Sequence, residues 1–455
     1  MFDDTIIAIS TPLGYGGLGI VRLSGEKSLP IAKKIFKPKK KGKQIEPLHP
    51  ILGNLYNFED KECFEEAYLT YFPRPHTYTR EDVVEISCHG SPVILEEIIR
   101  LGIKAGARHA NPGEFTLRAY LNGRIDIIQA EAINDIIQAK SLKQAKISFH
   151  QLEGGLSKTF ASLRDETVRV LSLIEASLEF PEEGLRISKN QILITIEKGI
   201  KKLRRLIESY DLGKTLSEGI TLALVGRANV GKSTLFNSLI EKKRAIVTPF
   251  PGTTRDYLTE NMKIEDSLFT LVDMAGFDTT LHPADREGIR RGKKLASEAD
   301  GILLLLDASQ NIMPEDIELI RKYRKKKTIL LFNKIDLPRK INVDEIQEEV
   351  PGLPSLEISA LKKTNLDKLK KMIYSLFVPS LEEKKEVILH LRQKLLLEKI
   401  LDYFRRAKSL LKEGYSEEIY VQEIKEAIPL LGQLTGEIKV EEVIQEIFSR
   451  FCVGK

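Results

Sequence analysis

A glycine-rich stretch between two apolar runs constrains the fold more than any other feature of the chain. Residues 226–234 read Gly-Arg-Ala-Asn-Val-Gly-Lys-Ser-Thr, after the apolar run 220–225 and before the apolar positions of 235–240. A strand, a glycine turn and a helix in this order aim backbone N–H groups and a helix N-terminus at one point, where they bind a polyanion. A chance Gly-Lys-Ser turn would lack the flanking elements. The sequence therefore predicts an α/β domain with a phosphate-binding loop.

Two side chains of this loop have expected roles at a nucleotide. Lys232 would bridge the β- and γ-phosphates, and the hydroxyl of Ser233 would hold Mg²⁺. The other loop residues expected to contact the nucleotide are Asn229, Val230, Gly231 and Thr234.

A second motif indicates which base is bound. The apolar run 328–332 leads into Asn333, Lys334, Ile335 and Asp336. The Asp336 carboxylate can accept from two adjacent N–H donors on guanine, whereas adenine would leave the buried charge unpaired. The sequence therefore indicates GTP. The expected base site is completed by Asn333, Lys334, Ser359, Ala360 and Leu361, with the Ala360 N–H closing over the base.

The parts that hydrolysis needs lie between these motifs. Asp273, Met274, Ala275 and Gly276 follow the strand predicted at 268–272. Asp273 is expected to reach Mg²⁺ through water, and the Gly276 N–H to meet the γ-phosphate. Upstream, Thr254 would ligate Mg²⁺ only while the γ-phosphate holds its loop closed. These motifs indicate a GTP hydrolase that is also a switch.

One position departs from the Ras-like pattern. Phe277 follows Gly276, where a water-orienting glutamine would otherwise stand, so another group must complete the site. A potassium ion held by the amide oxygen of Asn229 and by backbone carbonyls of 247–253 would neutralise developing charge as an arginine finger does. On local chemistry alone, Asn229 is equally well a turn residue. The nucleotide contacts expected in this segment are Thr248, Pro249, Phe250, Pro251, Gly252 and Thr253.

The pattern along the chain predicts several domains, and the length of 455 residues suggests three at roughly 150 residues each. Apolar strands alternate with helical segments over 216–378, as in a parallel α/β sheet. Helical periodicity fills 119–215 and 379–455, so the α/β domain is expected to be inserted into an all-α domain. Residues 1–118 predict an α+β unit, with Gly14, Gly16, Gly17 and Gly19 in the connection between two strands.

Composition excludes some classes of protein. No run of about 20 apolar residues occurs, and no basic start precedes an apolar segment, so a cytoplasmic chain without stable membrane association is expected. Three cysteines without metal-ligand spacing argue against a disulfide framework. The net charge is only +5, but basic residues cluster at 33–43, 290–294 and 322–327. Each cluster is either a solvated surface or a contact for a nucleic-acid backbone.

Segments along the whole chain resemble the MnmE (TrmE) family of tRNA uridine modification GTPases. They are residues 5–25, 81–85, 89–90, 111–119 and 126–132, the GTPase motifs, and the terminal Phe-Cys-Val-Gly-Lys of 451–455. The resemblance implies an N-terminal domain that dimerises and binds (6S)-5-formyl-tetrahydrofolate or a related one-carbon folate, a helical domain and an inserted Ras-like domain. It implies a homodimer that works with the flavoprotein MnmG (GidA) to build a carboxymethylaminomethyl- or aminomethyl-type group on carbon 5 of the wobble uridine of certain tRNAs.

The resemblance also implies roles for single residues. Potassium stimulation is a family property, and the matching K⁺ ligands are Asn229, Thr248, Phe250 and Thr253. Arg22, Glu85 and Arg124 match the folate contacts, with Lys455 near the ligand and Cys452 needed for modification. Asp285 aligns with a glutamate that helps to orient the attacking water. Because aspartate is one methylene shorter, neighbouring Glu287 is an alternative.

Two other classes of GTPase are less consistent with the sequence. A GTPase of ribosome assembly would bring an RNA-binding appendage such as a KH module. A membrane-associated mechanical GTPase would carry an amphipathic or apolar membrane element. The sequence shows neither, so a GTP hydrolase of tRNA modification is the expected function.

Overall fold

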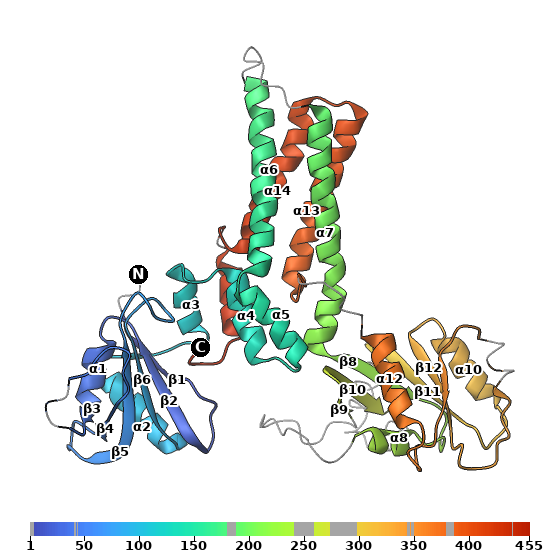
Figure 1. The fold of residues 1–455 in the computed structure, drawn as a ribbon, viewed down its shortest axis with the longest axis horizontal. Coiled ribbons are helices and arrows are strands. Elements are labelled where there is room, and N and C mark those ends of the chain that lie inside the picture. Colours follow the sequence, from blue (N-terminus) through green and yellow to red (C-terminus); the bar gives the residue numbers. More distant parts are fainter. Residues whose placement is uncertain are drawn as a thin grey trace, which may run out of the picture. The chain divides into compact units, whose positions relative to one another are not determined.

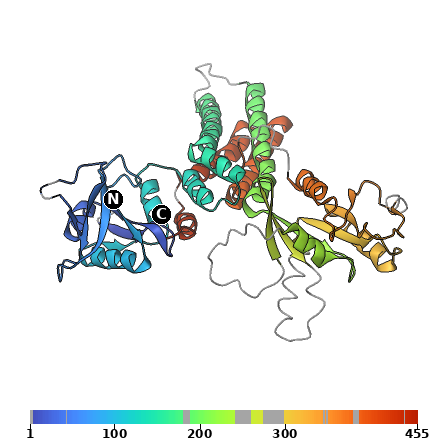
Figure 2. The same cartoon turned by 60° about the horizontal axis from the view of Figure 1, so that its bottom comes forward.

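The computed structural model describes residues 4–40, 42, 44–179, 188–240, 259–273, 298–343, 346, 350–378, 386–438 and 440–455. The chain forms two compact units, each with its own contacts (Figure 1, Figure 2). The first unit comprises Met1–Ile137, Ser148–Lys202 and Leu396–Lys455, and the second Gln138–Ile147 and Leu203–Leu395. No helix of these described ranges is long and apolar enough to cross a membrane.

The N-terminal part of the first unit is a seven-stranded sheet with helices packed on it. The strand order is β3-β4-β5-β6-β2-β1-β7. The helices α1 (Ser28–Ile35) and α2 (Pro92–Lys104) bury Ile31, Ile35 and Ile98 in one hydrophobic core with the sheet. The strands are β1 (Ile6–Ile9), β2 (Gly16–Ser24), β3 (Phe36–Pro38), β4 (Ile51–Tyr56), β5 (Cys63–Phe72), β6 (Val83–Gly90) and β7 (Arg108–His109).

The glycines near the N-terminus correct one expectation. Gly16, Gly17 and Gly19 lie within β2, and only Gly14 lies in the connection before it. The pairing of β2 with β6 is irregular between Gly16 and Gly19. A Cβ added to Gly90 of β6 would come within 2.8 Å of the Gly16 carbonyl oxygen. A Cβ on Gly19 would lie 3.1 Å from Gly90 Cα, so Gly19 and Gly90 let the two strands approach closely, and these glycines do not mark a turn.

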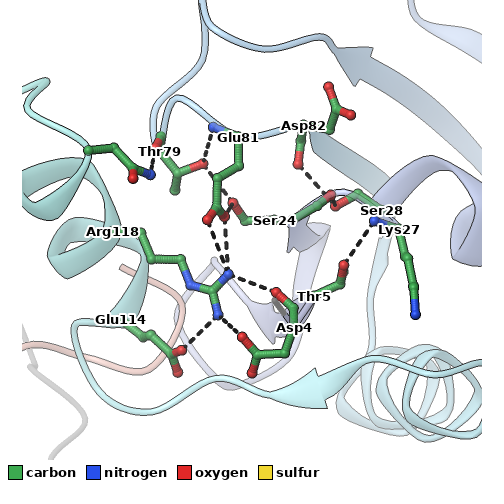
Figure 3. Close-up of polar contacts among 12 residues, drawn as sticks. Asp4, Thr5, Ser24, Lys27, Ser28, Thr79, Glu81, Asp82, Glu114 and Arg118 are labelled. Carbon is green, nitrogen blue, oxygen red and sulfur yellow. Dashed lines mark hydrogen bonds and ion pairs between the residues drawn. The ribbon is translucent and has the colours of Figure 1, made fainter. Parts of the chain in front are cut away.

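A buried arginine fixes helix α3 (Glu114–Leu121) to the sheet (Figure 3). Arg118 is fully buried, and its Nη2 donates to Asp4 Oδ1 at 2.7 Å and to Glu114 Oε1 at 3.0 Å. Its Nη1 donates to Glu81 Oε2 at 3.1 Å. Burial raises the pKa of Asp4 and of Glu114, but the arginine hydrogen bonds outweigh burial, and both pKa values are lowered. The network therefore favours the ionised form of buried Glu114 and of partly exposed Asp4.

Helices from both sides of the second unit's sequence pack together, as expected for an insertion. Helices α6 and α14 lie side by side (Figure 1), and Lys425 Nζ lies 2.6 Å from Glu175 Oε1. A Cβ on Gly199 of α7 would meet the Phe404 side chain of α13 at 2.6 Å. The helices are α4 (Ile127–Ile137), α5 (Leu142–Leu152), α6 (Gly155–Glu179), α7 (Lys189–Glu218), α13 (Leu391–Glu413), α14 (Glu417–Thr435) and α15 (Glu441–Ser449).

The second unit contains a six-stranded sheet of order β13-β12-β11-β8-β10-β9. All neighbouring strands are parallel except β10 and β9, which confirms the predicted mostly parallel α/β domain. Apolar side chains fill both faces, as burial between helices requires. The elements are β8 (Ile220–Val225), α8 (Lys232–Leu239), β9 (Thr259–Ile264), β10 (Ser267–Asp273), β11 (Gly301–Asp307), α10 (Pro314–Tyr323), β12 (Thr328–Asn333), β13 (Ser355–Glu357) and α12 (Leu366–Phe377).

Candidate functional site

The expected nucleotide-binding residues meet at one edge of the parallel sheet. The glycine-rich loop follows β8, Asp273 ends β10, Asn333 ends β12, and Ser359 follows β13. Parallel strands place their carboxyl ends at the same edge, where ligands of open α/β sheets bind. The fold therefore brings together motifs that lie more than 100 residues apart in the chain.

The glycine-rich loop wraps around its own lysine. Gly231 has φ of +101°, and a Cβ there would meet Asn333 Nδ2 at 2.3 Å, so only glycine fits. Lys232 begins α8, and its Nζ donates to the carbonyl oxygens of Gly226 and Arg227, both at 2.7 Å. The side chain is buried within the loop. A cation is thus held at a helix N-terminus, an arrangement that attracts phosphate.

The two oxygen groups expected near magnesium are hydrogen-bonded to each other. Ser233 Oγ donates to Asp273 Oδ2 at 2.9 Å. Asp273 is only 1% exposed, which is rare for a carboxylate without a functional or structural reason. One hydroxyl and one carboxylate fit Mg²⁺, which takes few protein ligands and keeps waters and phosphate oxygens as the others. The described residues contain no cluster of three or more His, Cys, Asp or Glu that could hold a metal by itself.

The base-selecting motif ties two loops together. Asn333 Nδ2 donates to the Val230 carbonyl at 2.8 Å, and Asn333 Oδ1 accepts the Ala360 N–H at 2.9 Å. The Ala360 N–H was expected to face the base, but here it is used within the protein. The physical reason is that Asn333 is 2% exposed, and a buried amide needs partners for both its ends. Asn333 therefore sets the distance between the phosphate loop and the base loop.

The residues next to Asn333 are also engaged. Ser359 Oγ donates to Asp336 Oδ1 at 2.5 Å, which orients the carboxylate expected to bind guanine. Lys334 Nζ donates to the Asn229 carbonyl and to Asp307 Oδ2, both at 2.7 Å. Leu361 is 72% exposed beside them.

Sequence reasoning missed Asp307. Burial raises its pKa, but the hydrogen bonds from Lys334 and Ser309 outweigh burial and lower it. The available signal was an aspartate at the end of a buried strand.

The remaining expected nucleotide and hydrolysis residues lie outside the described residues. They are Thr248, Pro249, Phe250, Pro251, Gly252, Thr253, Thr254, Met274, Ala275, Gly276, Phe277, Asp285 and Glu287.

A second site lies in the N-terminal domain, at a cavity of about 490 Å³ whose lining includes Tyr78, Glu85 and Arg124. Arg22 places Nε and Nη2 each at 2.8 Å from Glu85 Oε1. The guanidinium carbons of Arg124 and Arg22 lie 4.8 and 5.6 Å from the Tyr78 ring centre. The fold thus brings the three expected folate contacts together around an aromatic ring.

Tyr78 was missed by the sequence analysis. Its hydroxyl lies 2.8 Å from Thr116 Oγ1, and burial raises its pKa. No local signal marks it, because its neighbours Arg22 and Arg124 are far away in the chain.

The C-terminal tail docks at the same domain. Ser10 Oγ donates to the Gly454 carbonyl at 3.2 Å, and the Gly113 N–H donates to the Cys452 carbonyl at 3.4 Å. Cys452 is exposed, whereas Cys88 is buried. Burial raises the pKa of the Cys88 thiol to about 11. Burial lowers the pKa of Lys455, and the nearby Arg22 lowers it further. The tail therefore ends close to the Arg22–Glu85 pair.

Comparisons with known proteins agree along the chain. One family model, described as the GTP-binding protein TrmE N-terminus, matches residues 5–124, and another, the MnmE helical domain, matches residues 127–452. A protein named tRNA modification GTPase MnmE from Aquifex aeolicus (strain VF5) is 40% identical over 454 residues, which cover 99% of this chain and 100% of the relative. A protein of the same name from Thermoanaerobacter sp. (strain X514) is 40% identical over 463 residues and 100% of both chains.

A solved structure also matches part of the chain. It is an Era variant from Aquifex aeolicus bound to GDP and AlF4⁻, 31% identical over 40% of this chain and 66% of that one. Its TM-score to this chain is 0.27. The two family models and the full-length relatives are sufficient, and they show that the chain belongs to the MnmE (TrmE) family of tRNA modification GTPases.

Proposed function

We propose that this chain hydrolyses GTP with potassium stimulation and, with the flavoprotein MnmG, modifies carbon 5 of the wobble uridine of certain tRNAs. The product carries a carboxymethylaminomethyl- or aminomethyl-type group, and a one-carbon tetrahydrofolate serves the reaction. The observation that carries the proposal is the docked tail, with Cys452 at Gly113 and Lys455 near the Arg22–Glu85 pair, in a chain that also holds a phosphate-binding loop. The chain acts as a cytoplasmic homodimer.

The nucleotide part of the proposal rests on the edge of the parallel sheet. Lys232 would meet the phosphates, Ser233 and Thr254 would hold Mg²⁺, and Asp336 would accept from guanine. Asp285 would orient the attacking water. The short hydrogen bond from Ser359 supports the role of Asp336, because it fixes the carboxylate before a base arrives.

A potassium ion would complete this site through Asn229, Thr248, Phe250 and Thr253. Asn229 has φ of +64°, and its carbonyl oxygen is occupied by Lys334. Its side-chain amide makes no hydrogen bond to the described residues, so the amide oxygen is available for a cation. The ion would add positive charge where negative charge develops during hydrolysis.

Replacing sodium by potassium should therefore raise the rate of GTP hydrolysis by about tenfold, the effect of about 1.4 kcal/mol of transition-state stabilisation. Phosphate release at constant ionic strength measures it, with Asn229→Ala as the variant that loses the response. Equal rates in both salts would remove the ion from the proposal.

The folate part rests on the cavity in the N-terminal domain. Glu85 would hydrogen-bond the amino edge of the pterin, while Arg22, Arg124 and Lys455 would meet polar or carboxylate groups. A volume of about 490 Å³ is in the range of small-molecule sites. We assign residues 1–118 to this domain, 119–215 and 379–455 to the helical domain, and 216–378 to the inserted GTPase domain.

Nucleoside mass spectrometry of tRNA from cells that lack the chain tests the whole proposal. The modified wobble uridine should disappear, the wild-type gene should restore it, and a Lys232→Ala gene should not. Normal wobble uridines in the deletion strain would contradict the proposal.

A further inference from the structure

The second unit contains a cavity that the nucleotide site does not use. Its volume is about 380 Å³. One wall is the turn of residues 324–327 between α10 and β12, and the other is the turn of residues 350–354 before β13, with Leu376 of α12 beside them. We call this feature the basic cavity.

The basic cavity lies at the opposite end of the sheet from the GTP site. Its two turns precede β12 and β13, whereas Asn333 and Ser359 follow the ends of these parallel strands. The six residues of β12 span about 20 Å at about 3.3 Å per residue. A ligand in the basic cavity would therefore not compete with GTP.

The sequence around the cavity has an unusual density of positive charge. Residues 321–327 contain two arginines and four lysines among seven positions. The dipole of α10 accounts for Arg321 and Lys322 in its last turn. The dipole does not account for the four cations of residues 324–327, which follow the helix. These like charges repel one another, and an anion bound between them would relieve the repulsion.

Three of these cations have no partner that neutralises them in the described part of the chain. Arg324, Lys325 and Lys327 form no ion pair with a described residue, whereas Lys326 is engaged. None of the described residues that line the cavity carries a carboxylate. Among the described lining residues, no carboxylate balances the positive charge, and this arrangement favours binding of an anion over binding of a cation.

The backbone holds this turn in place. The Lys326 N–H donates to the Tyr323 carbonyl at 2.9 Å, and so does Thr328 Oγ1 at 2.9 Å. The Ile302 N–H donates to the Lys327 carbonyl at 3.0 Å, which joins the turn to β11. The charges are thus presented by an ordered turn on the sheet, so binding an anion costs little backbone entropy.

We propose that the basic cavity binds the phosphate backbone of a folded RNA. This inference rests on the proposed function, in which tRNA is the substrate. Lysines are point charges suited to phosphates, whereas recognition of acidic peptides favours the bidentate fork of arginine, of which the cavity has one. The lining includes no aromatic, Asn or Gln side chain among described residues, so the site positions RNA without reading its bases.

The salt dependence of tRNA binding tests the site in the full-length chain. The variant is Arg324→Gln, Lys325→Gln and Lys327→Gln, and the control is Lys158→Gln, Lys198→Gln and Lys368→Gln, which removes the same charge from three separate exposed positions outside the basic clusters. The probe is an unmodified tRNA transcript in fluorescence anisotropy. The first variant should bind about 10- to 100-fold more weakly, with a salt slope smaller by about 2 to 3, because each lost phosphate contact removes about 0.9.

The control should keep the wild-type affinity and slope, and both variants should hydrolyse GTP at the wild-type rate without RNA. If the first variant keeps the wild-type affinity and salt slope, the basic cavity is not an RNA site, whereas the proposed function of the chain still stands. Equal losses in both variants would overturn the RNA site as well, since the effect would then follow net charge. If the wild-type chain does not bind tRNA, this inference fails, and so does the direct contact between the chain and tRNA in the proposed function. If the first variant instead loses binding to MnmG in a way that does not depend on salt, the cavity is a protein-binding surface.

Discussion

The nucleotide edge of the second unit and the tail site of the first hold charged groups in different ways. At the nucleotide edge, each functional residue lies at a strand end or in the loop or helix start that follows it, and buried Asn333 joins the loops. At the tail site, the closest contact joins Ser10 and Gly454, 444 positions apart. Short motifs encode the first arrangement, whereas the second exists only when the two ends of the chain meet.

The two sites also differ in how firmly they are held. Hydrogen bonds of 2.5 to 2.9 Å hold Asn333, Asp336 and Lys232, and those of Asn333 are buried. Hydrogen bonds of 3.2 and 3.4 Å hold the tail, together with the close approach of Gly454 to the Ile9 carbonyl. Small changes in the tail should therefore disturb modification without disturbing GTP hydrolysis.

The largest expected effect separates the two sites completely. Cys452→Ser should abolish tRNA modification and leave GTP hydrolysis unchanged, because the thiol lies at the tail site. Wobble-uridine analysis and phosphate release measure the two activities. Cys63→Ser, which changes another exposed thiol of the same unit, is the control. A fully modifying Cys452→Ser protein would remove the thiol from the reaction.

At the nucleotide edge, Asp336→Asn should weaken GTP binding about 100-fold, or about 2.7 kcal/mol, because the amide can no longer accept from both guanine N–H groups. The variant should bind xanthosine triphosphate better than the wild type does, since the amide can donate to the second carbonyl. Titration calorimetry measures both, with exposed Asp367→Asn as the control. Unchanged GTP affinity would show that the base is recognised elsewhere.

A smaller effect is expected from one methyl group in the tail. A Cβ on Gly454 would lie 2.0 Å from the Ile9 carbonyl oxygen, and the residue has φ of +96°. Gly454→Ala should displace the tail and slow modification about tenfold, equivalent to about 1.4 kcal/mol, while GTP hydrolysis is unaffected. Gly17→Ala, where a Cβ has open space, is the control. Equal modification rates would mean that the docked tail is not needed.

The smallest effect concerns the acid stability of the N-terminal domain. The pKa values of Asp4 and Glu114 are lowered in the folded chain from ordinary values of 3.8 and 4.5. The unfolded chain therefore binds more protons over this range, so the stabilisation is complete above about pH 5 and is lost as pH falls through the folded pKa values. Urea unfolding followed between pH 6 and 3 by the tyrosine signal should show this loss.

Arg108→Gln should flatten that dependence, because Arg108 binds both carboxylates (Figure 3 shows their common partner Arg118). Arg74→Gln should retain it, because Arg74 forms no ion pair with a described carboxylate. An identical pH profile for both variants would assign the acid sensitivity to other groups.

Much of the nucleotide edge could be predicted because its signals are local. Apolar runs of strand length, glycine at positive φ and polar residues after each strand identified the parallel sheet and placed Lys232, Ser233, Asp273 and Asn333 at one edge. The helical insertion followed from a change of periodicity. The sequence did not indicate that the Ala360 N–H donates to buried Asn333, because such a contact depends on burial.

Residues alone determined the fold class, the phosphate-binding loop and the choice of guanine, since neighbours in the chain specify strands, turns and helix starts. Only the tertiary structure decided that Arg22 and Arg124 both contact the Tyr78 ring, that Gly19 of β2 serves close strand packing, and that the tail docks at Ser10. Contacts between distant residues leave no periodic trace in the sequence, because they depend on how whole elements pack.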